Sequence, residues 1–198
     1  VWGGVKMDEF IAWSIRHNLY GLENLSHIPG TVGASAVQNI GAYGTEVSQY
    51  IDSVRAIDVE TLKERTFDKE ECAYAYRDSH FKHHRHRIVT RVTYMLSPTF
   101  TPNLKYGNIA SLIANQEPTA QEVREAVIAA RESKLPDPKV QGNAGSFFMN
   151  PIVGIQEYNS LASEYGFVPH YPAPGSGQTK LSAAWLIEQA GWKGRALG

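Results

Sequence analysis

The sequence predicts an α+β protein in two parts, and three observations lead to this prediction. Residues 51–59 mix β-branched with polar residues, and residues 88–96 alternate between two faces, as strands do. Helical spacing begins near residue 119 and recurs in later segments. Prolines interrupt the pattern between residues 97 and 103. Strands thus cluster before this break and helices after it, as in α+β proteins.

Composition and net charge restrict the classes of protein to which the chain can belong. The chain has 198 residues, 42% of them hydrophobic and 20% charged, enough for one large domain or two small ones. A net charge of −1 argues against a general nucleic-acid binder, and no apolar run has the length of a membrane span. The single cysteine, Cys72, excludes an internal disulfide, fits a reducing compartment and is expected to be buried.

The first half is expected to open with a helix. Asp8 precedes apolar residues at helical spacing and is expected to cap that helix, with Gly21 as a stop signal beyond it. After the strand at 51–59, a turn at 61–65 leads into a second short strand that starts at 66–67. The alternating segment at 88–96 is then the third strand.

The second half is expected to be mainly helical. Thr119 and Glu122 form a capping box before a helix. Further helices are expected at 156–165 and 181–190, separated by a proline- and glycine-rich loop at 169–177. We therefore divide the chain into residues 1–100, a connecting segment and helix at 101–133, and residues 134–198.

The uncharged stretch at 30–44, GTVGASAVQNIGAYG, is the most informative motif. Its glycines allow tight turns and leave backbone N–H groups uncovered, and such N–H arrays bind phosphate. The spacing is neither GxGxxG nor a P-loop. Taken alone, it fits a phosphate-binding cradle and a purely structural loop equally well.

Three blocks resemble one known family. They are GLENL with IPG and QNIGAYG at 21–44, YRDS at 76–79, and KLPDPK with GNAGSFF at 134–148. In this order they resemble the UDP-N-acetylenolpyruvoylglucosamine reductases, bacterial flavoenzymes that make the muramic acid precursor of peptidoglycan. The resemblance implies the larger part of a vanillyl-alcohol oxidase-type FAD-binding domain, followed by an incomplete α+β substrate-binding domain. It also implies a cytoplasmic monomer.

The implied reaction uses FAD and NADPH to reduce UDP-N-acetylglucosamine enolpyruvate to UDP-N-acetylmuramate. Arg77 then matches the arginine that stabilises the enolate-like charge, and a guanidinium suits a carboxylate because it binds in a bidentate manner. Without the resemblance, Arg77 reads as a surface arginine paired with an acid. Ser146 matches the proton donor, whereas alone it reads as a turn serine. No GxSxG elbow surrounds Ser146, so a serine hydrolase is not indicated.

The remaining site residues follow from the resemblance. The cofactor set lies in the glycine-rich stretch and the third strand: Gly30, Gly33, Ala34, Ser35, Val37, Ile40, Gly41 and Ile88. The substrate set is expected at the diphosphate, sugar and uridine: Tyr106, Lys134, Asn150, Tyr171, Lys180 and Lys193. Met149 stands where many relatives carry lysine, so no phosphate contact is expected there.

Four histidines at 80–86 lie between lysine and arginine residues. Interleaved cations repel a metal ion, so we favour a solvated basic turn over a metal site and expect no metal.

The family also has an N-terminal flavin segment and a C-terminal catalytic glutamate, and nothing in this sequence matches either. The chain starts at Val1, so we expect a missing beginning and little activity from these residues alone. Two other functions stay open: a different flavin oxidoreductase of the same fold, and a non-catalytic UDP-sugar binding module.

Overall fold

The computed structural model describes residues 1–106, 108–137, 140–142, 147–173 and 175–195. Its contacts divide the chain into two units, Val1–Gln141 and Gly142–Gly198. Each unit is a mixture of helices and antiparallel strands, so the α+β prediction is confirmed. Among the described residues, the helices are all too short or too polar to cross a membrane.

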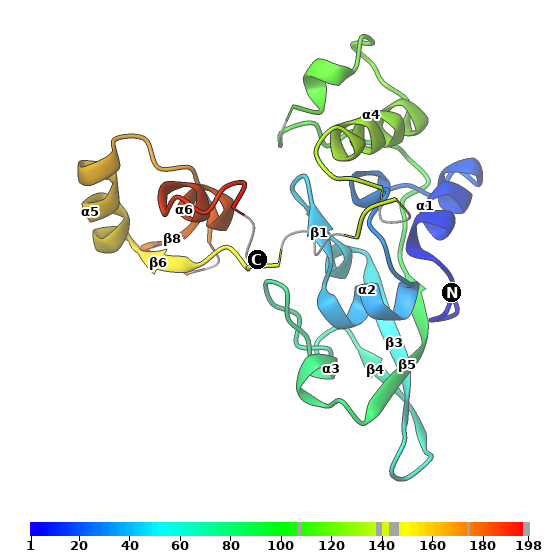
Figure 1. The fold of residues 1–198 in the computed structure, drawn as a ribbon. Coiled ribbons are helices and arrows are strands. Elements are labelled where there is room, and N and C mark those ends of the chain that lie inside the picture. The colour runs from blue at the N-terminus through cyan, green and yellow to red at the C-terminus, as the bar shows by residue number, and fades with distance from the viewer. Residues whose placement is uncertain (107, 138–139, 143–146, 174, 196–198) are drawn as a thin grey trace. The chain divides into compact units, whose positions relative to one another are not determined.

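The first unit is built around a three-stranded antiparallel sheet in the order β4-β3-β5 (Figure 1). Its helices and strands follow one another along the chain: α1 Met7–Arg16, α2 Val32–Gln38, β1 Gly41–Ala42, β2 Thr45–Glu46, β3 Ile51–Asp58, β4 Glu64–Asp68, α3 His80–His83, β5 Arg87–Tyr94 and α4 Ala120–Glu132. Short 3-10 turns lie between them: η1 Glu23–Leu25, η2 Val47–Gln49 and η3 Ala110–Leu112.

The apolar residues of these elements form the core. Ile11 of α1, Val32 of α2, Val54 of β3 and Val92 of β5 are fully or almost fully buried in one cluster. Helix α2 lies beside β5 in Figure 1 and contacts it. This contact is close because Gly33 carries no Cβ: a Cβ there would lie 3.2 Å from the carbonyl oxygens of Gly3 and Val89.

All three predicted strands are present, with ends shifted by one to two residues. Strand β3 ends one residue before the expected end, and β5 runs from Arg87 to Tyr94 rather than from 88 to 96. Cys72 is buried, as expected, and burial raises the pKa of its thiol to about 11.

Two expectations for the first helix are wrong. Lys6 occupies the N-cap position, and Asp8 lies inside the first turn, where its carboxylate accepts the N–H of His27 rather than an N–H of its own helix. The helix ends at Arg16, well before Gly21, because the backbone already turns at Asn18, which has a φ of 56°. The glycine-rich stretch also differs from a loop, since α2 occupies its middle.

Helix α4 confirms the predicted capping box. Thr119 accepts the N–H of Glu122, and the Glu122 carboxylate accepts the N–H of Thr119. The helix contacts η1 within the first unit, and its buried face forms a second small core with Ile109.

The second unit contains a sheet that the sequence analysis missed. Its three short strands pair antiparallel in the order β6-β8-β7, and two helices accompany them. The elements are β6 Ile152–Gly154, α5 Ile155–Tyr165, β7 His170–Pro172, β8 Gln178–Leu181 and α6 Ala183–Gln189. Strands of three or four residues are too short for alternation to show in a sequence. Strand β7 lies inside the expected loop, and it tolerates Pro172 because it is an edge strand.

Both expected helices of this unit are present. Helix α5 ends at Tyr165, and its C-cap residue Gly166 has a φ of 74°. Helix α6 begins later than expected, because Leu181 pairs in β8 and Ser182 caps the helix by accepting the N–H of Trp185.

Candidate active site

The site begins with a tight turn that places Arg77. Ala75 and Asp78 exchange two backbone hydrogen bonds of 3.1 Å, so that Tyr76 and Arg77 form the tip of the turn. Arg77 has a φ of 54°, in the left-handed region that side chains other than glycine rarely adopt. Such backbone costs about 1–3 kcal/mol and persists only where the surroundings hold it.

The surroundings hold Arg77 through its guanidinium. Nη1 donates to the carbonyl of Asn39 at 3.2 Å, and Nη2 donates to the carbonyl of Gly41. The carboxylate of Glu46 lies 3.5 Å from Nη1. Gly41 has to be small here, because a Cβ at this position would lie 2.6 Å from Nη1 of Arg77. The structure thus brings the YRDS block onto the QNIGAYG block, 36 residues earlier in the chain.

Two buried side chains join the same two blocks. The hydroxyl of Ser79 donates to the carbonyl of Val37 at 2.7 Å, at the end of α2. The amide of Asn39, the C-cap residue of α2, donates to the carbonyl of Ala75 at 2.8 Å. Both residues are 1% exposed, so these bonds are shielded from water.

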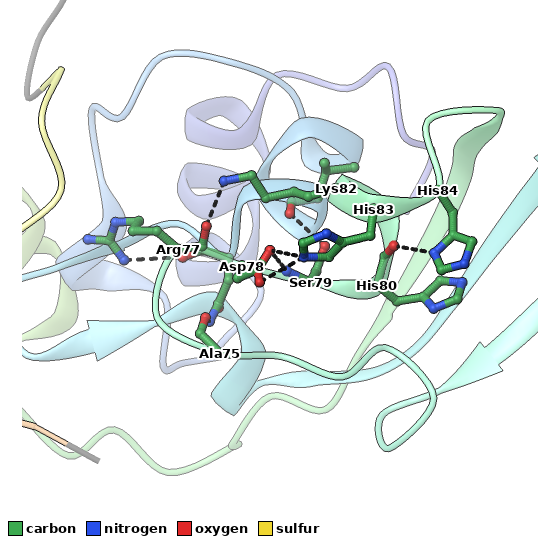
Figure 2. A network of polar contacts seen from close by, with 10 residues as sticks. Ala75, Arg77, Asp78, Ser79, His80, Lys82, His83 and His84 are labelled. Carbon is green, nitrogen blue, oxygen red and sulfur yellow. Dashed lines mark hydrogen bonds and ion pairs between the residues drawn. The ribbon is translucent and has the colours of Figure 1, made fainter. Parts of the chain in front are cut away.

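The other side of the turn is held by the histidine segment, as Figure 2 shows. Lys82 donates to the carbonyl of Arg77 at 2.7 Å, and the ring of His83 contacts both carboxylate oxygens of Asp78, at 2.9 and 3.0 Å. The hydrogen bond from His83 is the main cause that lowers the pKa of Asp78. These contacts fix the turn, while the guanidinium of Arg77 points away from this histidine segment in the view.

Tyr106 lies at the other end of the β1–β2 hairpin. A Cβ on Gly44 would lie 2.1 Å from the Tyr106 ring, and Gly44 has a φ of 78°. The buried amide of Asn24 donates to the carbonyls of Tyr43 and Asn103, at 2.9 and 2.8 Å, and so fastens the hairpin tip to the segment before Tyr106. One short hairpin therefore contacts Arg77 at Gly41 and Tyr106 at Gly44.

The N–H groups in the first turn of α2 already donate to acceptors within the protein. The N–H groups of Val32 and Gly33 donate to the carbonyls of Val5 and Gly3, both at 2.8 Å, and that of Ala34 donates to the Thr31 hydroxyl at 3.3 Å. This differs from an open N–H array, because the segment before α1 and the N-cap residue Thr31 supply the acceptors. The Ser35 hydroxyl is likewise buried and donates to the carbonyl of Val32.

The other expected cofactor residues offer apolar surface. Val37 and Ile40 are partly exposed at the end of α2, Ala34 is exposed, and Ile88 is 58% exposed on β5. Gly30 has a φ of 118°, and its carbonyl accepts the N–H of Met7. These residues fit the apolar part of a flavin better than its phosphates.

The expected substrate residues divide between the two units. Lys134 is exposed just beyond α4 in the first unit. In the second unit, Tyr171 of β7 pairs directly with Lys180 of β8, so these two lie side by side. The Asn150 side chain accepts the N–H of Ala183 at 2.9 Å, and Lys193 forms an ion pair with Glu188 at 2.5 Å. Ser146 lies outside the described residues, and Met149 is exposed.

The histidines of 80–86 each have a partner other than a metal. His83 contacts Asp78, and Nε2 of His86 lies 3.5 Å from a carboxylate oxygen of Asp58. The rings of His80 and His84 stack with their centroids 3.9 Å apart. Burial, followed by the neighbouring His84 and arginines, lowers the pKa of His80. Within the described part of the chain, the histidine, cysteine and acidic side chains form no group of three that could hold a metal ion.

Sequence reasoning missed Asn39 and Glu46. Asn39 could have been found, because asparagine tolerates the left-handed C-cap conformation and stands between a helix and a glycine. Nothing in the sequence distinguishes Glu46 from other acidic residues.

Comparison with known families agrees with the two units. Residues 1–61 match the sequence profile described as "FAD binding domain". Residues 137–198 match the profile described as "UDP-N-acetylenolpyruvoylglucosamine reductase, C-terminal domain". Together with the α+β fold, these matches place the chain in the flavoprotein class.

Curated relatives cover the whole chain. The UDP-N-acetylenolpyruvoylglucosamine reductase of Dechloromonas aromatica (strain RCB) is 48% identical over an alignment of 203 positions, which covers 98% of this chain and 60% of that protein. The reductase of Polynucleobacter asymbioticus is 49% identical over an alignment of 201 positions, which covers 100% of this chain and 58% of that protein. The chain is therefore similar to UDP-N-acetylenolpyruvoylglucosamine reductases along its whole length, and it spans somewhat over half the length of these relatives.

A solved structure agrees on the fold. The crystal structure of UDP-N-acetylenolpyruvylglucosamine reductase from Thermus caldophilus matches with a TM-score of 0.62 at 22% identity, over 99% of this chain and 55% of that one.

Proposed function

We propose that the complete protein containing this chain is a flavin-dependent, NADPH-driven reductase that converts UDP-N-acetylglucosamine enolpyruvate to UDP-N-acetylmuramate for peptidoglycan. The observation that carries the proposal is the anchoring of the Arg77 guanidinium on the carbonyls of Asn39 and Gly41, inside the stretch that resembles the flavin loop. An arginine fixed in this way is suited to a substrate carboxylate.

The chain's own residues have distinct tasks in this proposal. When FAD is bound, it supplies hydride transfer from NADPH to the enolpyruvyl methylene carbon. Arg77 binds the enolpyruvyl carboxylate and stabilises the negative charge that develops there. Ser146 donates a proton to the carbon next to the carboxylate, so that one hydride and one proton saturate the double bond.

One set of residues is proposed to bind FAD and another to bind the substrate. Val37, Ile40 and Ile88 would contact the apolar ring system of FAD, with Gly30, Gly33, Ala34, Ser35 and Gly41 shaping the adjoining backbone. The residues proposed to contact the substrate are those that the family resemblance implies: Tyr106, Lys134, Asn150, Tyr171, Lys180 and Lys193. Cross-strand pairing of Tyr171 with Lys180 suits a uridine diphosphate, because an aromatic ring can stack on the base while an ammonium binds phosphate.

We further propose a cytoplasmic monomer with no metal, membrane or nucleic-acid partner.

The test uses the purified complete protein and its visible flavin absorbance. We expect bound flavin that NADPH bleaches without oxygen and that UDP-N-acetylglucosamine enolpyruvate restores. Flavin that NADPH reduces but this UDP sugar does not reoxidise would instead indicate another flavin oxidoreductase. Binding of the UDP sugar by a protein without flavin would indicate a binding module.

A further inference from the structure

Glu46 is an acidic residue beside the proposed catalytic cation. Its Oε1 lies 3.5 Å from Nη1 of Arg77, and its Oε2 accepts the amide of Asn39 at 3.3 Å. The two side chains of the ion pair are 23% and 35% exposed, so the pair is only partly screened by water. An ion pair in this position affects how strongly and in which direction Arg77 attracts another carboxylate.

Asn39 connects Glu46 to the rest of the turn. Its amide nitrogen donates to the carbonyl of Ala75, its amide oxygen accepts the N–H of Ser48, and its own carbonyl accepts Nη1 of Arg77. Since Asn39 is buried with all these groups engaged, its position is fixed. The orientation of Glu46 is fixed through it.

Arg77 has enough N–H groups to bind the protein and a ligand carboxylate at the same time. A guanidinium has five N–H groups, and the carbonyls of Asn39 and Gly41 each take one. Main-chain carbonyls therefore anchor both terminal nitrogens and leave further protons on the same nitrogens for a ligand. The Glu46 contact of 3.5 Å adds electrostatic attraction at a length beyond a normal hydrogen bond.

We propose that Glu46, held by Asn39, is a positioning residue that fixes the Arg77 guanidinium for the enolpyruvyl carboxylate. The inference rests on the proposed function, because it requires Arg77 to act on the substrate. It assigns Glu46 no contact with substrate or flavin. Its effect therefore has to pass through Arg77.

Glu46→Gln in the complete protein tests this, because glutamine keeps the size and the oxygen for Asn39 but removes the charge. We expect the limiting rate of flavin reoxidation by the substrate to fall about tenfold, as for a small misplacement of a catalytic group. The Kd for the substrate should not rise, because a negative charge near Arg77 is lost. Flavin reduction by NADPH should stay unchanged.

Glu64→Gln is the matched control. Glu64 forms an ion pair with Arg55 at the same 3.5 Å, on strands β4 and β3. This variant should leave both half-reactions at the wild-type rate. If Glu46→Gln behaves like Glu64→Gln, or slows both half-reactions equally, the inference is wrong. Should Glu46→Gln not fold, Glu46→Asp serves instead, with a smaller loss expected in the same half-reaction only.

A double variant separates this inference from the proposed function. In an Arg77→Lys background, Glu46→Gln should slow reoxidation by less than about twofold, because coupled residues are not additive. If Arg77→Lys itself has no selective effect on reoxidation, the role of Arg77 fails and the inference falls with it. If Arg77→Lys slows only reoxidation, but Glu46→Gln slows it further by the same factor as in the wild-type background, the role of Arg77 stands and the inference about Glu46 fails.

Discussion

Arg124 on α4 donates from both terminal nitrogens to the two carboxylate oxygens of Asp8 on α1, at 2.6 and 2.8 Å. The Arg124 side chain is 11% exposed and that of Asp8 is 34% exposed. This bidentate pair ties the first helix to a helix 116 residues later in the chain. Asp8 thus stabilises the fold through a distant arginine, although its sequence position suggests a local helix cap.

Asp8→Asn should lower the free energy of unfolding by about 1–2 kcal/mol at pH 7, the range for hydrogen bonds to charged groups with partial solvent screening. Burial acts to raise the pKa of Asp8, but the hydrogen bonds from Arg124 and from the His27 N–H outweigh it and lower the pKa. The stabilisation is therefore present above the ordinary aspartate pKa and is lost as the pH falls through the lowered value.

Denaturant titrations of both proteins across the acidic range measure this difference. Glu9→Gln is the control, because its ion pair with Lys6 is largely exposed and should contribute little. A difference between Asp8→Asn and wild type that persists unchanged at the lowest pH would contradict the pairing.

Gly44→Ala should destabilise the first unit by about 1–3 kcal/mol, since alanine at a φ of 78° is strained and its Cβ would meet the Tyr106 ring. Adding Tyr106→Ala should relieve the steric part of this loss but not the backbone part. Thermal unfolding measures both. Gly4→Ala is the control, because a Cβ at Gly4 would meet nothing within 4 Å. Equal melting temperatures for Gly4→Ala and Gly44→Ala would refute the close approach.

The sequence predicted those elements whose signals are local. Strand β5 has clear alternation, and the Thr119–Glu122 capping box depends on residues three apart, so both could be found. The hydrogen bonds at the N-terminus of α2 could not be found from the sequence. Their acceptors are the carbonyls of Gly3 and Val5, which lie about thirty residues earlier in the chain. The strands of the second unit carry too few residues for a periodic pattern.

The candidate site shows the same division. Arg77 and Gly41 were found from two motif blocks, but their contact is a tertiary relationship that neither block contains. Asn39 and Glu46 matter only because the turn at Ala75–Asp78 folds back onto them. The C-cap position of Asn39 has a local signal, but its contacts with Ala75 and Arg77, like the position of Glu46 beside Arg77, could be inferred only after the structure had brought the two blocks together.

Arg77→Lys in the complete protein should slow flavin reoxidation by the UDP sugar by orders of magnitude and leave flavin reduction by NADPH largely intact. Lysine keeps the charge but cannot donate to the carbonyls of Asn39 and Gly41 and to a carboxylate in one plane. Stopped-flow measurement of each half-reaction decides the matter. An equal loss in both halves would mean that Arg77 only holds the hairpin.

The last prediction concerns Ser146, the proposed proton donor, which lies outside the described residues. Ser146→Ala in the complete protein should still accept hydride from NADPH, because that step needs no proton from the protein. It should slow reoxidation about a hundred- to ten-thousandfold, the usual loss for a positioned general acid. Ser146→Cys should recover part of the rate, because a thiol is a stronger acid than an alcohol.

Reoxidation of pre-reduced flavin by the substrate in heavy water measures both the rate and the deuterium that enters the product. Ser182→Ala is a control of the same chemical change, because Ser182 caps α6 and is not proposed to touch substrate. It should leave the rate of proton transfer unchanged even if it lowers the melting temperature. If Ser146→Ala reoxidises at a rate close to that of wild type, with normal deuterium incorporation, another group donates the proton. The GNAGSFF segment would then serve only to shape the site.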